Sequence, residues 1–107
     1  MQLLAKSYFH HDVLVIALEG EVTLSTLPLL SDILNRQRQD HNVAPIAINL
    51  DALVSLDDAG LGILLGFAGR LRGEGRSCVV ACSQPGLRER LASTGFDRAV
   101  NVVSAPT

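Results

Sequence analysis

Residues 56–66 read LDDAGLGILLG, and the rest of the chain is organised around this stretch. An apolar run ends at Leu50, and after a short connection the carboxylates of Asp57 and Asp58 stand at the head of a glycine-rich apolar helix. A helix start offers unpaired backbone N–H groups and a partial positive charge, which suit a carboxylate or a phosphate. The stretch therefore predicts a charged site at a helix start, which could serve chemistry, a switch or only the capping of the helix.

The composition is typical of one folded domain spanning residues 1–107. Hydrophobic residues make up 48% of the chain and charged residues 19%, so a core can form without disulfides or metals. The net charge is −2 and no basic stripe is interleaved with aromatic residues, which argues against nucleic-acid binding. We interpret the arginines of the C-terminal half as solvated helix faces and turns, not as an anion-binding patch. They are Arg70, Arg72, Arg76, Arg88, Arg90 and Arg98.

The N-terminus and the apolar runs bear on localisation. The first residues lack the basic region followed by an apolar core that marks a signal peptide. No apolar run approaches the ~18 residues that a membrane-spanning helix needs. We expect a cytoplasmic protein with no direct membrane insertion, whose contact with a membrane, if any, comes through a partner.

The two cysteines, Cys78 and Cys82, lie four residues apart in an apolar run that predicts a strand. At the rise of a strand they would be ~13 Å apart, which is too far for a disulfide. No histidine or carboxylate stands at a spacing that would complete a zinc site. Both cysteines are therefore predicted to be buried thiols.

Hydrophobic periodicity divides the chain into elements in the order ββαβαβαβ. Strands are predicted over residues 3–9, 13–18, 46–50, 77–81 and 99–103. Helices are predicted over residues 26–41, 58–72 and 83–94, and loops over 19–23 and 51–55. This order favours an α/β fold with a mixed, mostly parallel sheet of about five strands and three main helices packed against it.

The helix over residues 58–72 has a predicted core face and a separate line of glycines. The core face consists of Leu61, Leu64, Leu65, Ala68 and Leu71. The glycines follow at steps of four, three and four, at Gly62, Gly66, Gly69 and Gly73. Each interior glycine costs ~1 kcal/mol of helix propensity relative to alanine. We interpret the glycine line as a smooth face that another backbone approaches closely.

Ile63 and Phe67 are four residues apart and lie off this predicted core face. Two placements stay open for them. They form an exposed apolar contact for a partner, or a neighbouring element of the same chain covers them.

The sequence does not support a catalytic or metal site of the common kinds. Gly60-Leu61-Gly62 is not a phosphate loop, because no Gly-Lys-Ser/Thr follows it. Asp51, Asp57 and Asp58 would hold a divalent cation only if all three carboxylates converged on one point. The histidines fall in turns far in sequence from residues 56–66, so no Ser/His/Asp set is indicated. We predict no catalytic site, no metal and no cofactor, and expect that the protein is not an enzyme.

Four segments carry a family resemblance. They are Gly20-Glu21-Val22-Thr23, Ile48-Asn49-Leu50-Asp51, Leu56-Asp57-Asp58-Ala59-Gly60-Leu61-Gly62, and Ser83-Gln84-Pro85-Gly86-Leu87 with Gly95-Phe96. In this order and spacing they resemble the STAS domain, and most of all the bacterial anti-sigma factor antagonists (anti-anti-sigma factors). The resemblance covers nearly the whole chain and implies the STAS fold.

The resemblance also implies a function. A small STAS protein of this kind binds a serine-kinase anti-sigma factor and frees the sigma factor. The kinase phosphorylates a Ser or Thr of an Asp-Ser-Ser/Ala-Gly motif at the start of the second helix, which breaks the complex, and a phosphatase restores binding. The STAS protein is then a substrate and a switch, not a catalyst. The partner-binding residues expected on this basis, with the two apolar positions added, are Glu21, Thr23, Asp57, Asp58, Ala59, Gly60, Gly62, Ile63 and Phe67.

Two positions depart from the family pattern. The phosphoacceptor position falls on Asp58, which has no hydroxyl, and Thr23 stands where the family often has an acid. Asp58 carries a charge of about −1, whereas phosphoserine carries about −1.5 to −2. We therefore expect phosphoswitching to be lost at this position. Asp58 then imitates the phosphorylated state and binds a kinase poorly, or it suits a co-adapted partner that binds constitutively. Ser55 is a weaker candidate phosphosite outside the motif position.

Two other hypotheses fit the same resemblance. The chain could be a STAS accessory subunit of an ABC-type lipid transporter, where it would brace an ATPase subunit and need no switch. It could also be a scaffold in a multi-STAS signalling complex, with other STAS proteins or a second copy of itself as partners.

Overall fold

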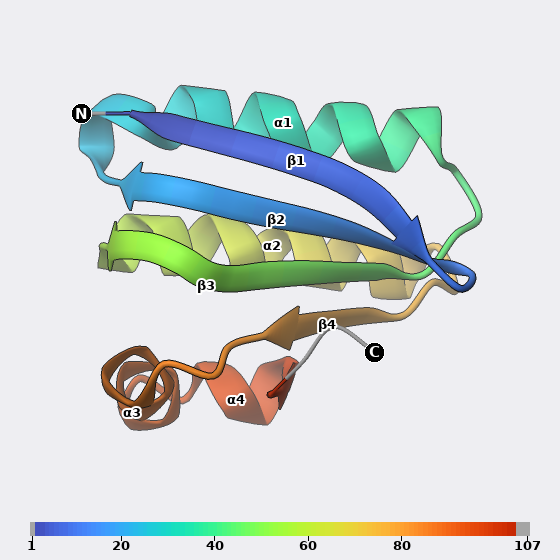
Figure 1. The fold of residues 1–107 in the computed structure, drawn as a ribbon. Coiled ribbons are helices and arrows are strands. Elements are labelled where there is room, and N and C mark those ends of the chain that lie inside the picture. The colour runs from blue at the N-terminus through green and yellow to red at the C-terminus, as the bar shows by residue number, and fades with distance from the viewer. Residues whose placement is uncertain (1, 105–107) are drawn as a thin grey trace.

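The computed structural model describes residues 2–104, whose backbone forms one five-stranded sheet with helices packed on it (Figure 1). The strands are β1 (Leu3–His10), β2 (Val13–Val22), β3 (Ile46–Leu56), β4 (Cys78–Ala81) and β5 (Asn101–Val103). The helices are the 3-10 turn η1 (Leu24–Thr26), α1 (Leu27–Asp40), α2 (Asp58–Gly73), α3 (Pro85–Ser93) and the short α4 (Phe96–Ala99). The strands lie in the order of the sequence, with β1 antiparallel to β2 and the others parallel. The predicted mixed, mostly parallel α/β fold is confirmed.

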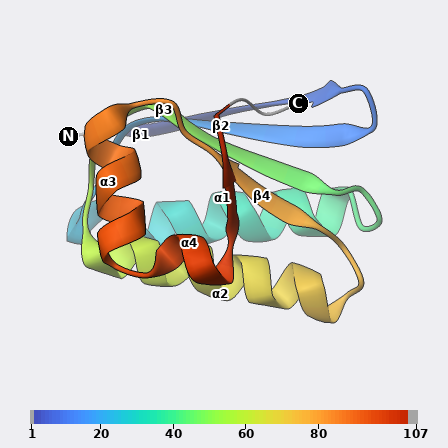
Figure 2. The same cartoon turned by 90° about the horizontal axis from the view of Figure 1, so that it is seen from below.

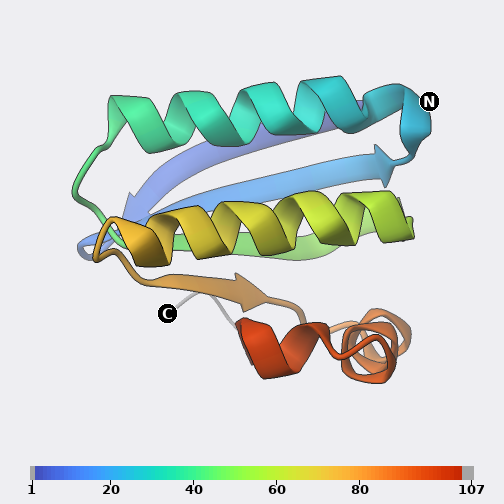
Figure 3. The same cartoon turned by 180° about the vertical axis from the view of Figure 1, so that it is seen from behind.

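The long helices α1 and α2 lie side by side on one face of the sheet (Figures 2 and 3). Alternate residues of the central strands point to this face, because successive side chains of a strand project to opposite sides. The core side chains that are almost completely buried include Leu14, Ile16, Leu18, Ile46, Ile48 and Leu50 of the strands, and Leu30, Leu34, Leu64 and Leu71 of the helices. The core is thus aliphatic, as the low aromatic content of the sequence indicates.

The strands β2 and β3 are longer than predicted, because both continue through the segments expected to be loops. Their pairing shifts register twice, between Ala17 and Glu19 and between Gly20 and Glu21 of β2. Gly20 has a φ of 105°, which side-chain-bearing residues rarely adopt and which a bulge accommodates. Such irregular pairing breaks the alternation of apolar residues, so the sequence pattern resembles that of a loop.

The glycine line of α2 does not pack against another backbone, so that interpretation is wrong. A Cβ built on Gly62, Gly66, Gly69 or Gly73 would meet nothing within 4 Å. The close approach is instead at Gly60, where a Cβ would lie 2.4 Å from Cγ1 of Val22 and 2.9 Å from Cδ1 of Leu56. The first turn of α2 therefore rests directly on the ends of β2 and β3.

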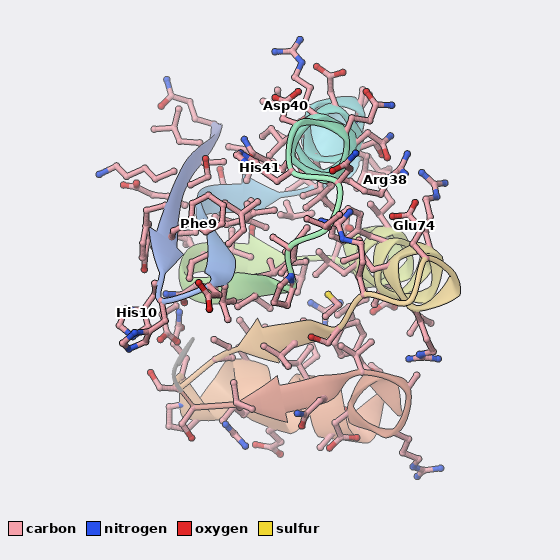
Figure 4. All side chains as sticks on the ribbon, turned by 90° about the vertical axis from the view of Figure 1, so that its right-hand side faces the viewer. Phe9, His10, Arg38, Asp40, His41 and Glu74 are labelled. Atoms are coloured by element: carbon pink, nitrogen blue, oxygen red, sulfur yellow. The ribbon has the colours of Figure 1, made fainter. Side chains whose placement is uncertain are left out.

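A buried arginine joins the elements at the opposite end of the molecule, which Figure 4 views end-on. The Arg76 side chain is 3% exposed. Its guanidinium donates hydrogen bonds to the backbone carbonyls of Ala44, Arg38 and His41 and to the carboxylate of Glu74. Arg38 reaches the same carboxylate with an N–O distance of 2.6 Å. The end of α1, the segment before β3 and the end of α2 are held together by this network.

Gly60→Ala is expected to destabilise the protein by about 1–3 kcal/mol, because the added methyl group overlaps Val22 and Leu56. The matched control is Gly62→Ala in the same helix, where the methyl group has open space and should stabilise by about 0.5–1 kcal/mol. Urea denaturation of the two variants measures both effects. Equal stabilities for the two variants would contradict the close approach at Gly60.

Glu74 should make stability depend on pH in the acidic range. Desolvation raises the pKa of Glu74, but hydrogen bonds from Arg76 and Arg38 outweigh it and hold the pKa below the ordinary 4.5. A carboxylate with a lowered folded-state pKa stabilises fully above about pH 4.5, and this contribution disappears as the pH falls through the folded-state pKa. Glu74→Gln should therefore be less stable than wild type at pH 7, with the difference shrinking below pH 4.5.

Denaturation of the wild type and Glu74→Gln between pH 3 and pH 7, a range of about four units around the carboxylate pKa, tests this prediction. Asp32→Asn is the control, because Asp32 and its partner Arg36 have side chains that are 59% and 74% exposed. Such exposed pairs contribute little, so this variant should follow the wild type. A Glu74→Gln difference that stays constant into the acid range would contradict the role of the network.

Candidate functional site

The start of α2 is fixed by Asp57, the residue that caps it. The backbone of Asp57 is extended, with φ −86° and ψ 172°, and its Oδ1 accepts a hydrogen bond of 3.0 Å from the backbone N–H of Gly60. The N–H of Asp57 donates to the carbonyl of Val22 at 3.0 Å. The ends of β2 and β3 and the start of α2 are therefore connected at one point, where the sequence predicted the site.

Asp58, the first residue of α2, points outward with a side chain that is 88% exposed. Its Oδ1 lies 2.6 Å from Nη2 of Arg90, which comes from α3. The Arg90 side chain is 32% exposed. The Asp58 carboxylate is thus paired with a cation from another helix, an arrangement that sequence reasoning missed. The only signal for it in the sequence is the group of C-terminal arginines. Their interpretation as solvated side chains is wrong for the buried Arg76 and for Arg90, which is paired with Asp58.

The end of β2 brings two further predicted residues to this region. The N–H of Thr23 donates to Oγ1 of Thr26 at 2.9 Å, and the Thr26 hydroxyl donates to the carbonyl of Glu21 at 3.0 Å. Thr23 and Asp57 also line a cleft of about 480 Å³ with Ser55, Leu87 and Arg90 among the other lining residues. Glu21 is half-buried and does not line the cleft itself, although the next residue, Val22, does.

The other predicted residues divide into exposed and buried ones. Ala59 and Gly62 are exposed and Ile63 is half-buried, packed against the core. Gly60 is buried under the sheet ends. Phe67 is only 4% exposed and belongs to the core, so the chain itself covers it and its assignment as a partner contact is wrong. Its side of α2 faces α1, and both helices line a small hollow there.

Three exposed apolar side chains near the site were not predicted. Leu24 in η1 is 76% exposed and Val54 at the end of β3 is 83% exposed. Leu65, assigned to the core face from its spacing, is 42% exposed and lines a second hollow with Asp58 and Gly62. The polar start of α2 is therefore flanked by apolar side chains that the core does not use.

Ser55 and Asp51 have structural surroundings that bear on their candidate roles. The Oγ of Ser55 is shielded from solvent and has no hydrogen-bond partner among residues 2–104. Oδ1 of Asp51 accepts a hydrogen bond of 2.6 Å from the N–H of Ser83, and the amide of Gln84 donates to the Asp51 carbonyl. Within the described residues no three acids, histidines or cysteines are grouped so that they could hold a metal ion.

The two cysteines are free thiols, with Cys82 buried and Cys78 half-buried. Desolvation raises the pKa of Cys78 to about 12 and raises the pKa of Cys82 as well. Both thiols stay protonated at neutral pH, and a protonated thiol is a poor nucleophile.

None of the helices among residues 2–104 is long and apolar enough to cross a membrane.

Comparison with known proteins relates this geometry to one family. Residues 5–105 match the family model of the STAS domain. The structure is similar to an anti-sigma factor antagonist from Mycobacterium paratuberculosis, with 25% identity, a TM-score of 0.86, and coverage of 97% of this chain and 87% of that chain. It is also similar to a putative anti-sigma factor antagonist from Thermotoga maritima, with 17% identity, a TM-score of 0.78, and coverage of 94% of this chain and 86% of that chain. A third similar structure is the anti-sigma factor antagonist SpoIIAA in its unphosphorylated form, with 18% identity, a TM-score of 0.70, and coverage of 95% of this chain and 89% of that chain.

The capping role of Asp57 predicts a graded response to substitution. Asp57→Ala removes the acceptor for the Gly60 N–H and should destabilise the protein by about 1 kcal/mol. Asp57→Asn keeps an acceptor oxygen, and asparagine caps helices about as well as aspartate, so it should stay close to wild type. Chemical denaturation of both variants separates the hydrogen bond from the charge. An Asn variant as unstable as the Ala variant would show that the charge matters and the hydrogen bond does not.

Proposed function

The chain belongs to the STAS domain family, and from this premise we propose that it is an anti-sigma factor antagonist. It binds a serine-kinase anti-sigma factor and thereby controls the availability of a sigma factor. It acts as a binding protein and not as a catalyst. The similarity to anti-sigma factor antagonists over nearly the whole chain supports this proposal.

The observation that carries the proposal is the exposed start of α2. Asp58 presents a charged group there, Leu65 lines the same hollow as Asp58, and Val54 lines the cleft beside Asp57. Protein interfaces combine apolar contact area with a few polar groups that determine specificity. The composition of this region therefore suits a protein partner.

Phosphorylation at this site is expected to be absent. Asp58 has no hydroxyl, and within residues 55–60 the only hydroxyl belongs to Ser55. The Ser55 Oγ is shielded from solvent in the structure, so a kinase would reach it only if the end of β3 opened. The proposed antagonist therefore binds its partner without a phosphoswitch at the start of α2.

Incubation with the cognate anti-sigma kinase and ATP tests the proposal, with complex formation followed by size-exclusion chromatography and phosphate located by mass spectrometry. We expect a complex with the wild type and no phosphate on residues 55–60. Asp58→Ser restores a hydroxyl at an exposed position and should become phosphorylated, which shows that the kinase is active.

Two results would contradict the proposal in different ways. Phosphate on Ser55 of the wild type would restore a switch that we expect to be lost. If neither the wild type nor Asp58→Ser bound the anti-sigma factor, the antagonist function would be wrong, and co-purification with a transporter ATPase would favour an accessory subunit instead.

A further inference from the structure

We infer that Arg90 determines which state of the switch Asp58 imitates. By neutralising the Asp58 carboxylate, Arg90 keeps the phosphoacceptor position in the charge state of the unphosphorylated, binding-competent motif. Asp58 is then not a substitute for phosphoserine, and binding is constitutive. The inference rests on the proposed function and deepens it, because it assigns the state of that same site.

The geometry shows how closely the two side chains are matched. Nη2 of Arg90 lies 2.6 Å from Oδ1 of Asp58, the short distance of a charge-assisted hydrogen bond. Among residues 2–104, the Asp58 carboxylate is the only group to which the Arg90 guanidinium donates. Arg90 lines the cleft beside Asp57, and Asp58 lines the neighbouring hollow, so the pair connects the two depressions of the proposed partner surface.

The net charge of Asp57, Asp58 and Arg90 together matches that of an unphosphorylated motif. Asp57 and Asp58 each contribute one negative charge and Arg90 contributes one positive charge, so about one negative charge remains. An aspartate followed by an unmodified serine also carries one negative charge. The same aspartate followed by phosphoserine carries about −2.5 to −3. A partner that is repelled by the phosphorylated motif would therefore meet no excess negative charge here.

The pair is suited to affect binding more than folding. Asp58 is 88% exposed, and exposed ion pairs contribute little to the free energy of unfolding. An uncompensated like charge at an interface, in contrast, disfavours association strongly. Removing the Arg90 guanidinium should therefore leave the fold intact and weaken the complex. The backbone contacts of α3, including the hydrogen bond from the Thr94 N–H to the Arg90 carbonyl, persist in any side-chain variant.

Isothermal titration of the cognate kinase anti-sigma factor into purified variants tests the inference. Arg90→Ala should weaken binding about tenfold or more, and Arg90→Glu should weaken it further because the local charge then approaches that of the phosphorylated motif. Arg90→Lys keeps the positive charge and should bind within a few-fold of wild type. The loss in Arg90→Ala should shrink at high salt. Arg36→Ala, which removes the arginine of an exposed pair on α1, is the matched control and should bind as wild type does.

The double variant Asp58→Ser with Arg90→Ala identifies the route by which Arg90 acts. It again carries one negative charge, from Asp57, so it should recover nearly all of the affinity lost in Arg90→Ala. If the double variant stays weak, Arg90 contacts the partner directly and the inference is overturned. Wild-type affinity in Arg90→Ala would overturn it as well. If the wild type and Asp58→Ser both fail to bind, the proposed function is wrong and the inference falls with it.

Discussion

The site depends on the contact between the first turn of α2 and the ends of β2 and β3. The hydrogen bond from the Asp57 N–H to the Val22 carbonyl and the absence of a side chain at Gly60 bring the helix onto the sheet. Neither interaction uses the side chain of Asp58, which is therefore free to point outward. A change of side chain at this position leaves the supporting contacts in place, so residue 58 can vary without disturbing the fold.

Burial gives the Arg76–Glu74 network and the Asp58–Arg90 pair different roles. Arg76 is almost completely buried, and its guanidinium donates to three backbone carbonyls besides Glu74. A buried charge is tolerated only when its hydrogen-bonding groups are satisfied in this way, so that network belongs to the fold. The Asp58–Arg90 pair is largely exposed and connects two side chains only. We therefore propose that this pair acts on the surface that a binding partner meets, and not on the fold.

Much of the fold could be predicted from the sequence, because element order and strand type follow from local periodicity. The positions where β2 and β3 end could not be predicted, because two register shifts break the alternation of apolar and polar residues that marks a strand. The predicted core face of α2 is confirmed at Leu61, Leu64, Ala68 and Leu71. Two positions of this helix were assigned incorrectly for a different reason. Leu65 and Phe67 are two residues apart and therefore lie on different sides of the helix. Phe67 is buried on the side that faces α1, whereas Leu65 is 42% exposed. Helical spacing defines a face but does not identify what covers it.

The candidate site shows the same limit in its electrostatics. The sequence predicts Asp57 and Asp58 at a helix start. From those two residues alone, the proposed switch position could imitate either the phosphorylated or the unphosphorylated state. The group that we propose distinguishes these two states, Arg90, lies 32 residues away on another helix. The charge that a partner meets is the sum of the charges on side chains that the fold brings together. The electrostatic interaction with these charges is screened over a distance of about 8 Å at physiological salt. Whether an acidic residue imitates a phosphate is therefore a property of its surroundings in three dimensions and not of the residue itself.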